Sequence, residues 1–70
     1  MPTLYIVTGD GDMHEEYYPT LQAADSASDM HDDEGNLVFF SWFDAMNALG
    51  RVRNHSPAYK QKIKDWVNNP

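Results

Sequence analysis

The chain has 70 residues, no cysteine and a formal net charge of −6. This composition excludes disulfide bonds and thiolate zinc sites, and no apolar run reaches the roughly 18 residues that cross a bilayer. The length fits one domain over residues 1–70 with a thin core, and we interpret the chain as a complete cytoplasmic protein.

The N-terminal residues favour a β-hairpin. The segment 3–8 (TLYIVT) is rich in β-branched and aromatic residues, which favour strands. It precedes the turn sequence 9–12 (GDGD), in which glycine permits positive φ and aspartate closes tight turns. We expect residues 13–18 (MHEEYY) to return as a second strand, with either Tyr17 or Tyr18 pointing outward.

A first helix is expected over residues 20–33, started by Pro19 and stopped by Gly35. On a helical wheel, one side is small and apolar: Ala23, Ala24, Ala27 and Met30. The opposite side carries four carboxylates: Asp25, Asp29, Asp32 and Asp33. The short apolar run 36–40 (NLVFF) then predicts a strand buried within the sheet.

Two further helices are expected in the C-terminal part. The first is capped by Ser41 and has an apolar stripe: Trp42, Ala45, Met46, Leu49 and Val52. After a break at residues 54–55, Ser56 and Pro57 start the second, whose inner face is formed by Tyr59, Ile63, Trp66 and Val67. The predicted fold class is α+β: a small single domain of order β-β-α-β-α-α, with a three-stranded antiparallel sheet and helices packed on one face.

Catalytic and metal-binding motifs are absent from the sequence. It has no nucleophile elbow, no HExxH motif and no phosphate-binding glycine loop, and Gly9 and Gly11 are explained by the turn. Residues 10–14 (DGDMH) and 29–33 (DMHDD) place carboxylates beside imidazoles, but neither has the spacing of a calcium-binding loop. We therefore expect a protein that is not an enzyme and that binds no metal or cofactor.

The charges are segregated along the chain. Residues 1–50 hold ten of the eleven acidic residues and no Lys or Arg, whereas all five basic residues lie in 51–70. An ordinary surface intersperses the two signs. Carboxylates in rows have the sign of a nucleic-acid backbone and can occupy a basic groove that binds nucleic acid.

No motif identifies a family. In size, acidity and lack of catalytic motifs, the chain is similar to very small acidic proteins of phages and mobile elements, such as anti-CRISPR, anti-restriction and uracil-DNA glycosylase inhibitor proteins. This is a similarity of physical type, and it assigns no residue a role. The leading hypothesis is a DNA-mimicking inhibitor that covers the basic surface of a host defence or repair protein, without binding nucleic acid or membrane itself. The expected partner-binding residues are Glu15, Glu16, Asp25, Asp29, Asp32 and Asp33, with an aromatic anchor at Tyr17, Tyr18 or Phe40.

Two alternatives stay open. An accessory protein–protein interaction domain would use an exposed aromatic surface from residues 39–43 (FFSWF), or form a homodimer, and its acidity would serve only solubility. A small nucleic-acid binder would instead use the basic C-terminal residues: Arg51, Arg53, Lys60, Lys62 and Lys64. The acidic residues elsewhere in the chain oppose the second alternative, because they repel phosphates.

Overall fold

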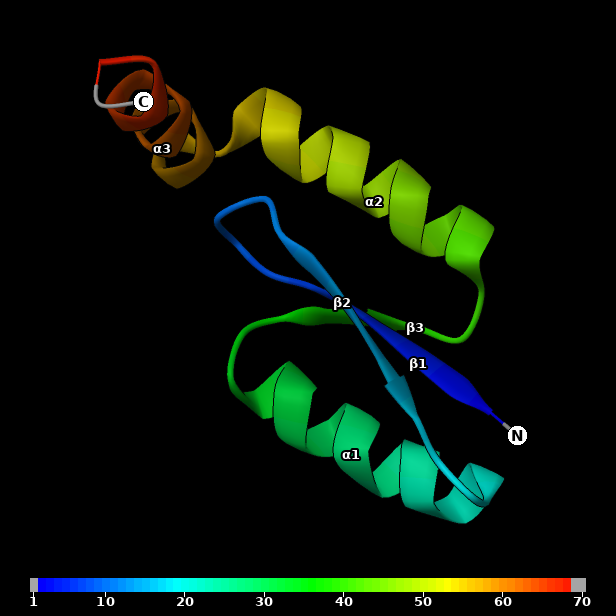
Figure 1. Ribbon diagram of the computed structural model, residues 1–70. Coiled ribbons are helices and arrows are strands. Elements are labelled where there is room, and N and C mark those ends of the chain that lie inside the picture. The colour runs from blue at the N-terminus through cyan, green and yellow to red at the C-terminus, as the bar shows by residue number, and fades with distance from the viewer. Residues whose placement is uncertain (1, 69–70) are drawn as a thin grey trace.

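The computed structural model describes residues 2–68 and contains a three-stranded antiparallel sheet and three helices (Figure 1). In chain order the elements are β1 (Thr3–Val7), β2 (Met13–Tyr17), α1 (Leu21–Asp33), β3 (Leu37–Phe39), α2 (Trp42–His55) and α3 (Pro57–Asn68). The predicted α+β class, element order and antiparallel pairing are confirmed. Within residues 2–68, no helix combines the length and the apolar character needed to cross a membrane.

β1 is the central strand of the sheet, between β2 and β3. It pairs along its whole length with β2, from Thr3 opposite Tyr17 to Val7 opposite Met13. β3 pairs only with residues 5–7 of β1. Because β3 lies at an edge and its Leu37 is 45% exposed, the expectation of a strand buried within the sheet is wrong.

The main core lies between the sheet and α2. Val7 forms a buried cluster with Ala45 and Leu49 of α2. Partly buried apolar side chains complete this cluster: Tyr5, Met13, Phe39 and Val52. Since alternate residues of a strand share a face, Tyr5 and Val7 turn toward α2 together.

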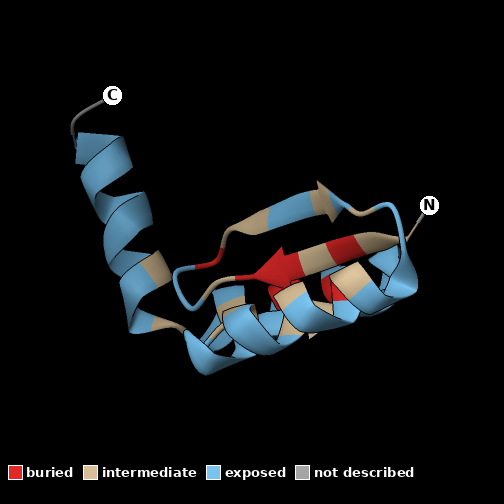
Figure 2. Ribbon diagram, turned by 90° about the horizontal axis from the view of Figure 1, so that it is seen from below, coloured by how far each residue is buried: buried red, intermediate tan, exposed pale blue. Residues whose placement is uncertain are grey.

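The opposite face of the sheet is covered by α1, as Figures 1 and 2 show. Leu4 and Ile6 are buried on this face, and Ala24 of α1 is fully buried. Glu16, which pairs with Leu4, also turns this way and contacts His31 of α1. The expectation that the helices share one face is therefore wrong. β1 is apolar on both faces, so each face requires its own helix.

Three hydroxyl side chains cap the helices, and the caps at Ser41 and Ser56 were expected from the sequence. Thr20 accepts a hydrogen bond from the N–H of Ala23, and Ser41 and Ser56 play the same role for α2 and α3. Pro19 therefore precedes the cap and does not start the helix. α2 continues through His55, so residues 54–55 do not form the expected break. Ser56 alone separates α2 from α3.

α3 extends away from the sheet and has no buried residue (Figure 2). The side chains expected on its inner face are exposed: Ile63 to 41%, Trp66 to 69% and Val67 to 62%. α1 and α2 already cover both faces of the sheet, so no face is left against which α3 can pack. The molecule is consequently elongated, with principal extents of 43 × 22 × 21 Å.

The junction of α2 and α3 is attached to the turn between β1 and β2. Ser56 Oγ donates to the carbonyl of Gly9 at 2.7 Å, and Arg53 Nε donates to the carbonyl of Gly11 at 2.9 Å. The guanidinium of Arg53 also lies 5.1 Å from the ring centroid of Tyr59, which packs against Gly11. The turn and the start of α3 therefore hold each other in place.

Gly11 lies where the turn and α3 are closest, so a substitution at this position tests the attachment of the turn to α3. Its φ of 88° is unfavourable for alanine, and a Cβ atom there would lie only 2.9 Å from Tyr59 Cγ. We expect Gly11→Ala to lower the free energy of unfolding by about 1–3 kcal/mol, measured by urea denaturation. Gly9→Ala is the matched control, because a Cβ at Gly9 meets nothing within 4 Å. Equal losses in the two variants would contradict the close packing of Tyr59 on the turn.

Candidate functional site

Four aspartates lie exposed on α1: Asp25, Asp29, Asp32 and Asp33. The helix rises about 1.5 Å per residue, so Asp25, Asp29 and Asp33 follow one another at intervals of about 6 Å. In the part of the chain that the structure describes, none of the four has an ion-pair partner. We call these four residues the α1 acidic row, and the structure brings them together as the sequence predicts.

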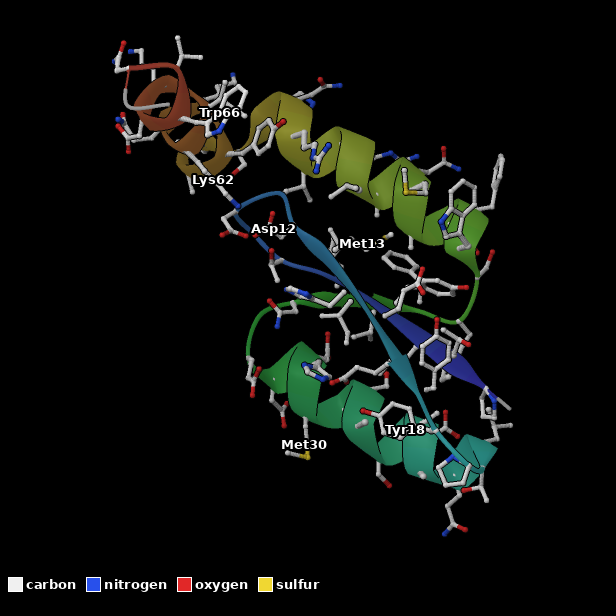
Figure 3. All side chains as sticks on the ribbon, viewed as in Figure 1. Asp12, Met13, Tyr18, Met30, Lys62 and Trp66 are labelled. Carbon is white, nitrogen blue, oxygen red and sulfur yellow. The ribbon has the colours of Figure 1, made fainter. Side chains whose placement is uncertain are left out.

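The inner side of α1 differs from the expected one. Met30 is 66% exposed and points away from the sheet (Figure 3), whereas the sequence placed it with the alanines of the core. His31 is the partly buried residue there, two helical turns after Ala24. On a helical wheel centred on Ala24, His31 falls on the covered side of α1. A methionine is expected in a core more often than a histidine, so the pattern favoured Met30.

The two glutamates of β2 point to opposite faces of the sheet, as neighbouring strand residues must. Glu16 faces α1, and Glu15 faces the side of α2. Each carboxylate accepts a hydrogen bond from a tyrosine hydroxyl, Glu15 from Tyr17 at 2.8 Å and Glu16 from Tyr18 at 2.7 Å. These bonds raise the pKa of both tyrosines above its usual value. Tyr17 is 66% exposed, so the expectation that one of the two tyrosines points outward is confirmed.

Glu16 connects β2 to α1. Its Oε1 accepts the Tyr18 hydroxyl and lies 2.8 Å from His31 Nε2. The bond from Tyr18, and after it the bond from His31, lowers the pKa of Glu16. His31 Nδ1 is buried without a hydrogen-bond partner in residues 2–68, and Glu34 Oε2 lies 3.7 Å from it. Glu16 is therefore a structural contact as well as a predicted binding residue.

The acidic residues of the hairpin turn are paired with α3. Lys62 Nζ lies 2.7 Å from Asp12 Oδ2 and 3.8 Å from Asp10 Oδ2, and Figure 3 shows Lys62 reaching toward Asp12. The hydrogen bond to Asp12 is the main reason that the pKa of Lys62 is raised. The Thr8 hydroxyl is the main reason that the pKa of Asp10 is lowered. No local sequence pattern indicates this pairing, because the two partners are 50 residues apart in the chain.

Large apolar side chains are exposed around the start of α2: Phe40 to 47%, Trp42 to 51%, Phe43 to 68% and Met46 to 37%. We call Trp42, Phe43 and Met46 the α2 aromatic flank. Trp42 and Met46 were expected to face the core, and that expectation is wrong. The buried residues of α2 are Ala45, Ala48 and Leu49. Small residues on that side let the helix approach the sheet closely, which leaves the larger side chains on its flank.

Comparison with known proteins gives no family for this chain: no family model, no curated protein and no solved structure matches it. Residues 2–68 contain no pocket and no group of three or more side chains able to hold a metal ion. The candidate site is a surface, defined by the geometry and the charge of its side chains. Its two parts are the α1 acidic row and the α2 aromatic flank.

The contact of Glu16 with Tyr18 and His31 makes the stability of the fold depend on pH. A carboxyl whose pKa is lowered by folding stabilises the fold above its usual value of 4.5, and this contribution is lost as the pH falls through the lowered pKa. Glu16→Gln removes the titrating group. We expect the stability difference between the wild type and Glu16→Gln, measured by urea denaturation at pH 7, to shrink as the pH falls below 4.5 and through the lowered pKa. The control is Glu15→Gln. A difference for Glu16→Gln that stays constant with pH would contradict the contact.

Proposed function

We propose that this chain is a non-enzymatic, DNA-mimicking inhibitor that covers a basic, nucleic-acid-binding surface of a partner protein, as small acidic proteins of phages and mobile elements do. The α1 acidic row carries the proposal. It places four exposed carboxylates on one helix, without a counter-charge in the described residues. The partner would be a defence or repair enzyme of the host cytoplasm.

The mechanism is electrostatic steering followed by steric occlusion. A row of like charges attracts a basic groove over a distance of about one Debye length, roughly 8–10 Å at physiological salt. The row is sparser than a duplex, which presents one charge per about 1.7 Å of axis. Ala24 and the contact between His31 and Glu16 hold α1 on the sheet. The carboxylates are therefore presented from an ordered helix, and little further ordering is required on binding.

The predicted binding residues fall into two groups on this proposal. The α1 acidic row makes the primary contact. Glu16 and Tyr18 lie on the same side of the sheet, where Glu16 contacts His31 on the inner side of α1. Glu15 and Tyr17 lie on the other side of β2, and Phe40 follows β3. These three residues contact the partner only if it extends around the sheet.

An accessory interaction domain is the second candidate function, and the α2 aromatic flank supports it. Phe43 and Trp42 are more than half exposed, and aromatic residues of this kind anchor protein interfaces. The third alternative, a nucleic-acid binder, has less support. Arg53 and Lys62 are already engaged by the hairpin turn, which leaves Arg51, Lys60 and Lys64 as available cations.

Charge reversal within the row tests the proposed function. We expect tagged wild-type chain to retain a nucleic-acid enzyme from bacterial lysate at low salt, and Asp25→Lys/Asp29→Lys to lose it. The matched control is Asp44→Lys/Asp65→Lys, which changes the net charge equally but lies outside α1. Added wild-type chain should also inhibit nucleic-acid binding by the purified enzyme, and the row variant should not.

Other outcomes separate the alternatives. Retention of the enzyme by Asp25→Lys/Asp29→Lys at moderate salt would overturn the role of the acidic row. Salt-resistant retention that is lost in Trp42→Ala/Phe43→Ala would establish the interaction domain instead, because apolar contacts are not screened by salt. A gel shift of DNA or RNA by the chain itself at low salt would favour the nucleic-acid binder.

A further inference from the structure

α3 presents an apolar face that nothing in the described structure covers. Ile63, Trp66 and Val67 are 41%, 69% and 62% exposed. Tyr59 lies on the same side at the start of the helix, where it packs on the hairpin turn. Beyond this first turn the helix projects from the domain (Figures 1 and 2), and Trp66 lies well away from the sheet (Figure 3).

A basic edge accompanies this apolar face. Lys60 and Lys64 are one helical turn apart and flank Ile63 and Val67. Both lysines are exposed, and neither has an ion-pair partner within residues 2–68. Lys62 lies on the other flank and turns back to the hairpin. The free side of α3 is therefore apolar with two cations along one edge.

The outer side of α1 has the complementary character. Its acidic row repeats at the same interval of four residues as Lys60 and Lys64. Two exposed apolar side chains lie on opposite flanks of this row, Leu21 (61%) and Met30 (66%), because nine helical residues turn them about 180° apart. α3 and α1 of one chain lie at different ends of the molecule, with the sheet between them (Figure 1). The complementary surfaces can therefore meet only between chains.

We propose that the surface that covers α3 belongs to a second copy of this chain, in which α3 of each copy docks along α1 of the other. The apolar face of α3 would pack on Leu21, on one flank of the acidic row, and the two lysines would pair with the carboxylates of the row. A two-fold axis makes both contacts equivalent, so one dimer satisfies both surfaces of each copy. A 70-residue domain also gains burial that its own thin core lacks.

This dimer does not rest on the proposed inhibitor function. Where both hold, the dimer covers the acidic row, so self-association and partner binding exclude each other. An anionic lipid surface is the competing occupant of a basic amphipathic helix with an exposed Trp. The net charge of −6 repels an anionic lipid surface, and it also repels a second copy at long range, so the dimer depends on the two contacts between segments of opposite sign.

Sedimentation equilibrium of the full chain tests the dimer. We expect the wild type to dimerise, and two variants to be at least about tenfold weaker: Lys60→Glu/Lys64→Glu and Asp25→Lys/Asp29→Lys. Each variant places like charges at both contacts. An equimolar mixture of the two restores opposite charges at both contacts and should form a heterodimer. Arg51→Glu is the control for a charge change outside the interface, and circular dichroism verifies the fold of each variant.

Trp66→Ala tests the apolar part without changing charge, and we expect it to weaken the dimer by about tenfold or more. Because it leaves the acidic row intact, it should still retain the partner of the proposed function, so the two proposals can fail separately. A wild type that stays monomeric up to about 1 mM would overturn the dimer. Unchanged dimerisation of Asp25→Lys/Asp29→Lys, or binding of the wild type to vesicles of anionic phospholipid without self-association, would also overturn it.

Discussion

Burial of β1 on both of its faces is the constraint on which the other features of this protein depend. A strand with apolar side chains on each side must be covered twice, and in this chain one helix covers each face. The helices approach through small residues, Ala24 on one side and Ala45 and Ala48 on the other. Both faces of the sheet are then occupied, and α3 has no sheet surface left against which to pack. Its exposed apolar side chains follow directly from this arrangement.

The same arrangement determines where the charges lie. α1 turns its carboxylates outward because its inner side holds the alanines and His31, and α3 extends from the other end of the molecule with its lysines. Among residues 2–68, ion pairs between the acidic and basic segments form only at the hairpin turn, where Lys62 pairs with Asp10 and Asp12. The charge segregation of the sequence therefore persists in space. Both proposed interactions, with a basic partner and with a second copy, depend on that separation.

Local sequence signals were sufficient to predict the helices and strands, because a cap or a turn depends on a few neighbouring residues. Ser41 and Ser56 cap their helices as expected, and the acidic row follows from helical spacing alone. The errors concern which side of an element is covered. Met30, Trp42 and Trp66 are apolar and were placed inward, but coverage depends on how many sheet faces exist and which helices reach them. Pairings such as Glu16 with His31 depend on strand register and on helix placement together, which composition does not specify.

Residue-resolved amide hydrogen exchange would test most directly whether α1 and α2 cover both faces of the sheet and leave α3 outside the core. In dilute solution, amides of β1 and of the middle of α2 should exchange only through global unfolding, while those of α3 beyond Tyr59 should exchange far faster through local opening. At concentrations where a dimer forms, protection of α3 should rise. Protection of α3 equal to that of β1 in dilute solution would contradict this account, because it would require a covering surface within the same chain.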